Sequence, residues 1–228
     1  MAAGARTAVL FDLDGTLTDP FVGISRSVQY AMEKLGWPVP AADDLRWCIG
    51  PPLKLAFARL LDTDDETAMD EAVRLYRERY AMVGKFENRL IDGIPEILSA
   101  LSARGHFLSV ATSKLKTFAG DIVDHFDLGR YFDALHGSEL DGRNAMKGDL
   151  VGHILATERI EPANAIMIGD REHDIQGAAA NGVAAIGVLW GYGDRMELEQ
   201  AGAVWIATRP SELPELVERV LEMRGRPA

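Results

Sequence analysis

The chain is poor in cysteine, and Cys48 is the single one among its 228 residues. One cysteine excludes a disulfide within the chain and fits a reducing compartment, so we expect a cytoplasmic protein. Cys48 lies in an apolar segment where a helix is expected. That setting favours a packing role, and a reactive thiol is the weaker interpretation.

Long apolar runs are also missing. No segment approaches the roughly 20 apolar residues that a membrane-spanning helix needs. No apolar region typical of a signal peptide precedes the segment that begins at Thr7. We therefore expect no membrane span and no secretion signal.

Positive charge is scarce as well, since 24 Lys and Arg face 35 Asp and Glu, giving a formal net charge of -11. The sequence shows no basic patch or tail, so we expect neither a nucleic-acid polymer nor a membrane surface as a partner. A small anionic substrate is compatible with this charge, because a metal ion or a few local cations can reverse the sign at one site.

What the chain does have is an ordinary globular composition, 47% hydrophobic and 26% charged. Its length suits one large domain, or a core with a smaller second domain. Short apolar segments alternate with helical patterns over most of the sequence. Strands are expected at 7–11, 107–111, 132–135, 165–168, 183–189 and 203–206. Helices are expected between them at 95–103, 115–126, 147–157, 174–181 and 213–223. This alternation predicts an α/β fold with a doubly wound, parallel, Rossmann-like sheet.

One long segment breaks the alternation. Residues 18–88 show apolar side chains at helical spacing and no strand pattern, with helices expected at 21–35, 41–49, 53–61 and 64–83. We therefore predict a core formed by residues 1–17 and 89–228, and a helical cap domain inserted at 18–88.

Two carboxylates, Asp12 and Asp14, stand two residues apart directly after the first predicted strand. Gly15 permits a sharp turn there, and Thr16 can cap that turn. Because open α/β sheets bind ligands at the carboxyl ends of their strands, this stretch is the first candidate site.

Two further strand ends present polar side chains. Thr112 and Ser113 follow the strand at 107–111, and Asp170 follows the strand at 165–168. Asp174 comes four residues later and shares a face with Asp170 if the next helix has begun. We expect these side chains to converge with the Asp12 stretch at one edge of the sheet.

Lys147 opens a predicted helix, where the positive end of the helix dipole disfavours a lysine unless an anion lies nearby. Acids that converge from separate strands also repel one another unless a cation lies among them. Mg²⁺ with oxygen ligands fits a site with few carboxylates. Mg²⁺, a lysine and hydroxyl donors together make a phosphate-binding site.

Phosphate monoesters hydrolyse extremely slowly unaided, and enzymes accelerate some of these reactions by up to ~10²¹-fold. The carboxylate pair suits this task, because one carboxylate can attack phosphorus and form an acyl phosphate. The other can protonate the leaving alkoxide and then deprotonate water. A metal would keep the nucleophile ionised, while neighbouring negative charge would raise the pKa of the second carboxyl.

The motifs Asp12-Leu13-Asp14-Gly15-Thr16, Thr112, Lys147 and Gly169-Asp170…Asp174 resemble, in order and spacing, the four motifs of the haloacid dehalogenase superfamily. The resemblance covers essentially the whole chain, and the helical insertion matches the cap of that family. It implies that Asp12 is the nucleophile and Asp14 the general acid/base. It also implies that Mg²⁺ is held by the Asp12 carboxylate, the Asp14 backbone carbonyl and Asp170.

The same resemblance gives roles to the remaining polar residues. Thr112, Ser113 and Lys147 would bind the transferring phosphoryl group, with help from backbone amides of the Asp12 loop. Asp174 would support the metal waters or orient Lys147. His173 is interpreted as a solvated loop histidine, because the metal ligands of the family are all oxygen atoms.

Asp14 argues against a dehalogenase, which needs no acid for a halide leaving group. The pattern is similar to the phosphoglycolate-phosphatase-like branch, and closest to its 5′-nucleotidase-like members in Gly50-Pro51-Pro52-Leu53, Asp141-Gly142-Arg143…Lys147 and Gly169–Asp174. Ser113 departs from the Asn that phosphoglycolate phosphatases often have. The expected function is a Mg²⁺-dependent phosphatase of a small phosphorylated metabolite, a 5′-nucleotide or phosphoglycolate. The alternatives are a sugar phosphomutase and a catalytically silent phosphate-binding protein.

Two segments carry open interpretations. Arg46, Gly50, Pro51 and Lys54 are candidate cap contacts to the substrate, and the alternative is a simple turn between helices. Trp190-Gly191-Tyr192-Gly193 either borders the site or is a flexible loop with partly buried aromatic side chains. The sequence gives no oligomeric state.

Overall fold

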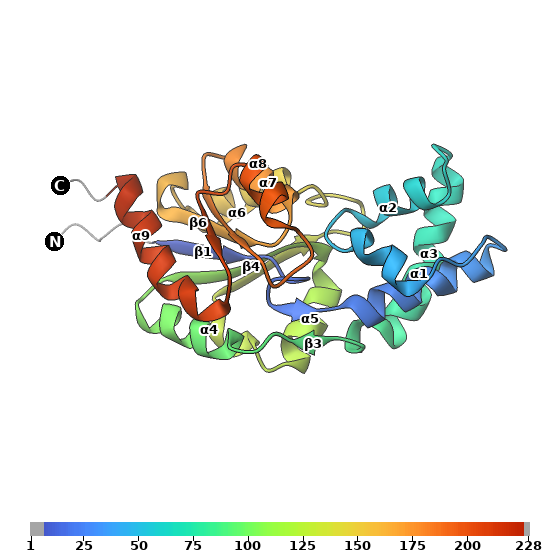
Figure 1. Ribbon diagram of the computed structural model, residues 1–228, viewed down its shortest axis with the longest axis horizontal. Helices are drawn as coiled ribbons and strands as arrows, with labels where there is room; N and C mark the ends of the chain where they lie inside the picture. The colour runs from blue at the N-terminus through green and yellow to red at the C-terminus, as the bar shows by residue number, and fades with distance from the viewer. Residues whose placement is uncertain (1–6, 226–228) are drawn as a thin grey trace.

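The computed structural model describes residues 7–225, in which one parallel sheet forms the centre of the larger part of the molecule (Figure 1). Its strand order is β5-β4-β1-β6-β7-β8, with every neighbouring pair parallel. The strands are β1 (Ala8–Phe11), β4 (Phe107–Leu115), β5 (Ala134–Ser138), β6 (Ala165–Gly169), β7 (Ala184–Val188) and β8 (Trp205–Ala207). Because β1 lies between β4 and β6, the residues that follow these three strands are neighbours in space.

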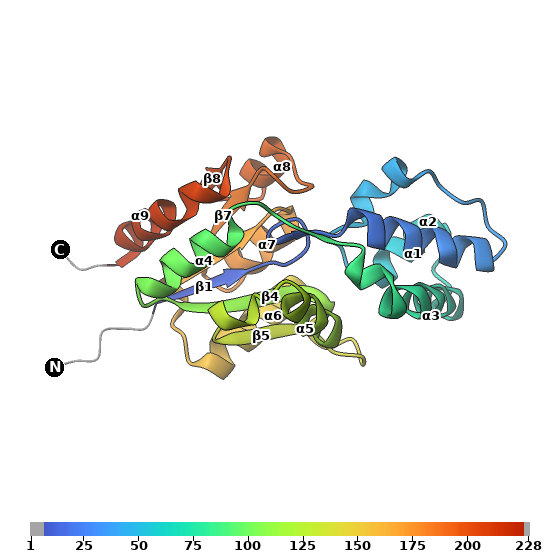
Figure 2. The same ribbon diagram turned by 90° about the horizontal axis from the view of Figure 1, so that it is seen from below.

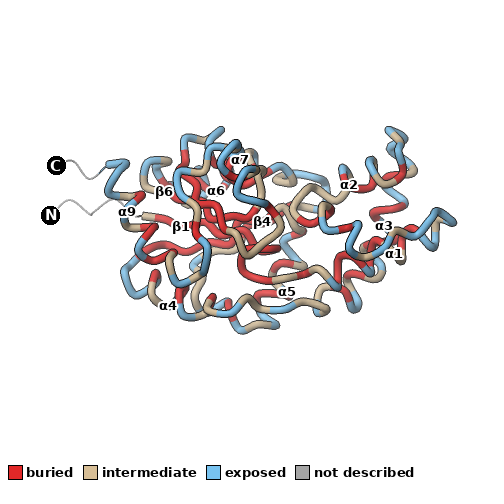
Figure 3. Tube along the Cα trace, in the orientation of Figure 1, coloured by how far each residue is buried: buried red, intermediate tan, exposed pale blue. Residues whose placement is uncertain are grey.

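The first strand is apolar throughout because both faces of the sheet are covered. Side chains alternate along it, so Val9 and Phe11 pack on one face, while Ala8 and Leu10 pack on the other. The first face is covered by α4 (Ile94–Ala103), α5 (Lys116–His125) and α9 (Leu213–Gly225). The second face is covered by α6 (Lys147–Glu158), α7 (Glu172–Ala179) and α8 (Arg195–Gln200). Figure 3 shows the buried strands in the centre and partly exposed helices around them. The predicted doubly wound sheet is confirmed.

Residues 21–86 form a separate helical unit beyond the carboxyl ends of the strands (Figure 2). Its elements are α1 (Phe21–Lys34), the 3₁₀-helix η1 (Ala42–Cys48), α2 (Leu53–Leu60), α3 (Glu66–Met82) and the 3₁₀-helix η2 (Gly84–Phe86). The unit has its own apolar core, in which Val28, Phe57 and Tyr80 are fully buried or nearly so. It differs from the sequence prediction at 41–49, where a 3₁₀-helix replaces the predicted helix, and at 84–86, where no helix is predicted.

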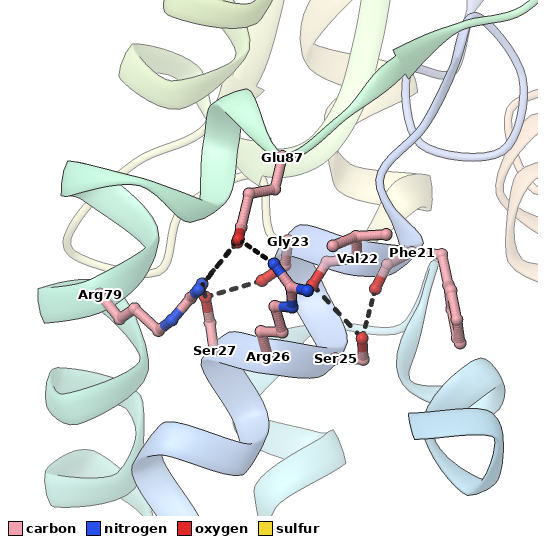
Figure 4. Close-up of polar contacts among 8 residues, drawn as sticks. All are labelled: Phe21, Val22, Gly23, Ser25, Arg26, Ser27, Arg79 and Glu87. Carbon is pink, nitrogen blue, oxygen red and sulfur yellow. Dashed lines mark hydrogen bonds and ion pairs between the residues drawn. The ribbon is translucent and has the colours of Figure 1, made fainter. Parts of the chain in front are cut away.

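The two connections to the helical unit form a short ladder that the sequence did not indicate. β2 (Thr18–Asp19) pairs antiparallel with β3 (Arg89–Leu90), so the chain enters and leaves the unit side by side. Next to the ladder, the Glu87 carboxylate accepts hydrogen bonds from Arg26 and Arg79 at 2.7 Å each (Figure 4). The backbone N–H of Gly23 also donates to the Glu87 carbonyl at 3.0 Å. These bonds fasten α1 and α3 together at the junction.

Three short 3₁₀-helices complete the described elements: η3 (Gly129–Tyr131), η4 (Pro162–Asn164) and η5 (Pro210–Glu212). The prediction also missed α8 and ended β4 four residues early. β4 continues to Leu115 because its pairing with β5 shifts register between Ala111 and Leu115. None of the helices in residues 7–225 is both long and apolar enough to cross a membrane.

Candidate active site

The polar residues of three strand ends meet at one edge of the sheet. The backbone N–H of Asp12 donates to the carbonyl of Ile168 at 2.9 Å, which carries the β1–β6 pairing to the base of the Asp12 loop. Thr112 and Ser113 lie near the carboxyl end of β4, and Asp170 directly follows β6. The site therefore results from sheet order, which brings together residues up to 158 positions apart.

Asp170 is fully buried, and two glycines leave room for it. A Cβ atom at Gly15 would lie 2.2 Å from a carboxylate oxygen of Asp170, and one at Gly191 would lie 2.3 Å from the same oxygen. The Thr16 hydroxyl donates to Asp170 at 3.3 Å, and the backbone N–H of Tyr192 donates to it at 2.8 Å. The segment 190–193 therefore borders the site, which agrees with the first of the two interpretations of this segment.

Lys147 lies at the centre of the charged groups, with its side chain only 4% exposed. Its Nζ atom donates to Asp12 Oδ1 at 2.8 Å and to the carbonyl of Ala111 at 2.9 Å, and it pairs with Asp174 Oδ1 at 2.7 Å. The sequence predicts one anion beside this helix start, and the structure places two there, the carboxylates of Asp12 and Asp174. Asp174 Oδ2 in turn accepts from the backbone N–H of Arg171 at 3.1 Å, which fixes the carboxylate at the start of α7.

Burial sets the ionisation of this cluster. It raises the pKa of Asp12 from 3.8 to about 7, with Lys147 opposing the shift and Asp174 and Asp14 adding to it. Burial likewise holds the pKa of Asp170 well above its usual range, and the negative charges of Asp174 and Asp12 add to that shift. Burial alone would lower the pKa of Lys147, but its attraction to Asp12 and Asp174 prevails and raises it.

Asp12, Asp170 and Asp174 make a donor set that fits a hard cation. One carboxylate oxygen from each lies within 4.8 Å of the other two, and all three residues are buried. Among these three carboxyl groups Lys147 is paired with Asp12 and Asp174, and their mutual repulsion adds to the effect of burial on the pKa values of Asp12 and Asp170. An all-oxygen set of this kind suits Mg²⁺. His173 does not belong to the cluster.

Asp14 is not part of this cluster and has a different partner. Its Oδ2 pairs with Lys114 Nζ at 2.7 Å, and both side chains are nearly buried. The Lys114 ammonium also donates to the Tyr80 hydroxyl of α3 at 2.5 Å. Asp14 Oδ1 is buried and has no hydrogen-bond partner among residues 7–225. It is therefore free to bond to a reacting group.

Lys114 is a core residue of the site to which the sequence interpretation gave no role. It stands two residues after Thr112, at the same strand end, and that position was the available signal. Its partner Tyr80 stands in the apolar stripe of a predicted helix, a pattern that indicates packing and not contact with a lysine of the core. Thr112 Oγ1 accepts the backbone N–H of Lys114 at 3.3 Å, which holds the end of β4 in place.

Above these residues lies a cavity of about 350 Å³ between the core and the helical unit. Asp12, Asp14 and the segment 112–115 line it from the core. Gly50, Pro51 and Lys54 line it from the helical unit. Arg46 does not reach this lining. Its guanidinium lies over the Phe21 ring, 4.5 Å from the ring centre, and pairs with Asp43 at 3.3 Å.

The segment around Gly50 is held against the core by Arg171. The Arg171 guanidinium donates to the carbonyl of Ile49 at 2.6 Å and to Glu197 at 2.8 Å.

Cys48, next to this segment, is buried, and burial raises the pKa of its thiol to about 12. The packing interpretation of Cys48 agrees with this environment, because only the thiolate is reactive.

Comparison with known proteins gives relatives of the same fold and of the family that the motifs resemble. The family model of the haloacid dehalogenase-like hydrolases matches residues 9–188. A 5′-nucleotidase from Pseudomonas aeruginosa is 51% identical over 190 residues, which make up 83% of this chain and 86% of that protein. Tyrosine-protein kinase PtkA from Mycobacterium tuberculosis is 38% identical over 92% of this chain and 71% of its own length. Among solved structures, a predicted phosphatase from Clostridium acetobutylicum has a TM-score of 0.90 at 42% identity, covering 95% of this chain and 100% of that one.

Phosphoglycolate phosphatases are also among the relatives. The matched region begins inside β1 and ends with β7, so it includes all three strand ends and the complete helical unit. The resemblance drawn from the motifs is thereby confirmed, and the chain belongs to the haloacid dehalogenase-like hydrolases, in the branch that contains 5′-nucleotidases and phosphoglycolate phosphatases.

Proposed function

We propose that the protein is a Mg²⁺-dependent phosphatase of a small phosphate monoester, a 5′-nucleotide or phosphoglycolate. The observation that carries this proposal is the placement of Asp12 and Asp14 on one cavity wall with different partners. Asp12 shares the buried ion pair of Lys147, whereas Asp14 pairs with Lys114 and keeps one oxygen free. Two carboxylates in two environments can take two roles.

In the first half of the reaction, a carboxylate oxygen of Asp12 attacks phosphorus. The bond to the ester oxygen breaks, and Asp14 in its acid form gives that oxygen a proton. The products are an aspartyl phosphate at residue 12 and a free alcohol. Lys147, Thr112 and Ser113 would bind the phosphoryl oxygens, because they are the cation and hydroxyls at the same edge of the sheet.

In the second half, the ionised Asp14 removes a proton from water as that water attacks the phosphorus of the aspartyl phosphate. Inorganic phosphate leaves and the Asp12 carboxylate is restored. The helical unit would act as the cap domain expected at 18–88, excluding bulk water while the acyl phosphate exists. Its contacts through Ile49 and Tyr80 support this role.

The metal would be held by the carboxylates of Asp12 and Asp170 and by the backbone carbonyl of Asp14, with Asp174 behind them. Mg²⁺ bound there would supply positive charge that neutralises the phosphoryl oxygens and keeps Asp12 ionised.

A cytoplasmic location, and the absence of nucleic-acid and membrane partners, stay predictions from the cysteine content and the charge.

The test of this function is phosphate release from a panel of phosphoglycolate, nucleoside 5′-monophosphates, sugar phosphates and p-nitrophenyl phosphate, with and without Mg²⁺. We expect Mg²⁺-dependent release of inorganic phosphate from p-nitrophenyl phosphate and from at least one metabolite. Interconversion of two sugar phosphates without net phosphate release would instead show a mutase. Binding of phosphate without any turnover would show a silent protein.

An Asp14→Asn substitution should separate the two halves of the reaction. With an alkyl phosphate, we expect turnover to fall by about 10²- to 10⁴-fold, because the leaving alkoxide is not protonated. With p-nitrophenyl phosphate, whose leaving group is a stable phenolate, the first turnover should stay fast and only the second step should slow. A burst of nitrophenol in a stopped-flow measurement checks this. Equal losses on both substrates, with no burst, would contradict the role of Asp14.

Binding of Mg²⁺ should depend on pH through the raised carboxyl pKa of Asp12. The Asp12 carboxyl keeps its proton up to about pH 7 in the folded protein, whereas it loses that proton near pH 3.8 in the unfolded chain. In the metal-free protein, the stability from this group is therefore present at low pH and lost as the pH rises through about 7. Mg²⁺ needs the ionised carboxylate, so its stabilising effect should grow over the same window.

The measurement is the increase in Tm on adding Mg²⁺, taken at several values between about pH 5 and about pH 8. We expect the increase to be small at the acidic end and to grow towards the neutral end. In the Asp170→Asn variant, the increase should be much smaller at every pH. A pH-independent increase, or one that Asp170→Asn leaves unchanged, would argue against this metal site.

A further inference from the structure

One face of α3 forms the outer wall of the cavity. Asp70, Val73, Tyr76, Arg77 and Tyr80 line it, at the three- and four-residue spacing of a single helical face. Tyr80 is the member nearest the chemistry, since its hydroxyl meets Lys114 beside Asp14. Arg77 lies three residues before Tyr80, which is about 4.5 Å along a helix axis.

The other cations along this cavity are already paired. Lys114 pairs with Asp14 at 2.7 Å, and Lys54 pairs with Asp70 at 2.8 Å and also with Glu66. Arg77 is partly buried, yet it makes no ion pair within 4 Å and no side-chain hydrogen bond with any residue in the described range 7–225. Burial lowers its pKa, and the attraction of Tyr76 and Asp70 opposes the shift without reversing it.

A guanidinium that lines a cavity without a carboxylate partner is favourably placed for an anionic ligand. Its planar set of N–H donors matches a carboxylate or a phosphate group with two parallel hydrogen bonds. The phosphoryl group that reacts at Asp12 already has Lys147 and the hydroxyls of the strand ends. An anion at Arg77 would therefore be a second one.

We propose that Arg77 binds a second anionic group on the leaving group, so that the preferred substrates are phosphate monoesters bearing a carboxylate or another phosphate. This inference rests on the proposed phosphatase function and narrows its substrate class. The short axial step from Tyr80 to Arg77 places the second anion a few atoms from the ester oxygen. Of the two candidate metabolites, phosphoglycolate meets this condition, and a nucleoside 5′-monophosphate has no second anion.

Three two-carbon substrates test the proposal directly. 2-Hydroxyethyl phosphate has a neutral end, phosphoglycolate ends in a carboxylate, and ethylene glycol bisphosphate ends in a second phosphate. In the wild-type protein, we expect kcat/KM to be about 10- to 100-fold higher for at least one anionic substrate than for the neutral one. Whichever anionic substrate shows the preference identifies the group that Arg77 binds.

The Arg77→Met variant should lose this preference, so that the ratio of kcat/KM between anionic and neutral substrates falls towards one. Arg77→Lys should keep part of it, because the charge stays and the paired N–H donors are lost. Arg74→Met is the matched control, since Arg74 lies one turn away on the same helix, is exposed and pairs with Glu71 and Glu78. It should keep the wild-type ratio. Arg77→Gln replaces Arg77→Met if the methionine lowers Tm.

An absent preference in the wild-type protein would overturn the proposal, and so would a preference that survives in both Arg77→Met and Arg77→Gln. Failure of the phosphatase function itself has a different signature. In that case the wild-type protein would release no phosphate from p-nitrophenyl phosphate or from any of the three substrates.

Discussion

Replacing Asp12 with asparagine is expected to reduce phosphate release by at least about 10⁴-fold with every substrate, because the carboxamide cannot attack phosphorus. Asparagine has nearly the same shape, and Lys147 keeps its ion pair with Asp174 at 2.7 Å, so the fold should persist while the reaction fails. The measurement is phosphate release in the presence of Mg²⁺, with circular dichroism as the check on folding. We expect loss of the first turnover as well as of the steady-state rate.

The matched control is Asp149→Asn, which removes a carboxylate from the first turn of α6, two residues from Lys147. Asp149 is exposed and does not line the cavity in the described part of the chain. Its substitution should leave the rate near that of the wild-type protein. Turnover that survives in Asp12→Asn would show that another group receives the phosphoryl group.

A Lys147→Met substitution is expected to have the largest effect on stability. The Lys147 side chain is 4% exposed, and its ammonium pairs with Asp12 and Asp174, whose side chains are 7% and 3% exposed. Removing one partner of a buried ion pair leaves uncompensated charge and destabilises proteins by about 3–5 kcal/mol. Urea unfolding without Mg²⁺ measures this loss, and phosphate release should also disappear because the phosphoryl group loses its cation.

The double variant Lys147→Met, Asp174→Asn separates the two consequences. Neutralising Asp174 removes one of the uncompensated charges, so part of the stability should return. Activity should not return, since the phosphoryl group still has no lysine. If stability and activity recovered together, Lys147 would be important only for folding. If the single variant were as stable as the wild type, the buried ion pair would be of no consequence to the fold.

Much of this site was accessible from the sequence because its residues follow strand ends. Asp12, Thr112 and Asp170 each stand directly after a short apolar run, and parallel strands present their carboxyl ends at a common edge. Lys147 was recognisable because a lysine at a helix start needs an anion, and the structure supplies Asp12 and Asp174. These inferences needed only local pattern and sheet topology.

The contacts between the two units were not accessible in this way. The Lys114–Tyr80 and Arg171–Ile49 hydrogen bonds depend on how the helical unit sits over the core. No local periodicity encodes that orientation. For the same reason the sequence pointed to Arg46 as a cavity contact, whereas the structure places Arg77 there and turns Arg46 towards Phe21.

The central claim is that Asp12 carries the phosphoryl group during turnover. Sodium borohydride, added while the enzyme is turning over p-nitrophenyl phosphate with Mg²⁺, reduces an aspartyl phosphate to homoserine. Peptide mass spectrometry then locates the reduced residue. We predict homoserine at position 12 in the wild-type protein and none in the absence of substrate. Sustained turnover with an unmodified Asp12, or with the reduction at another carboxylate, would contradict the claim.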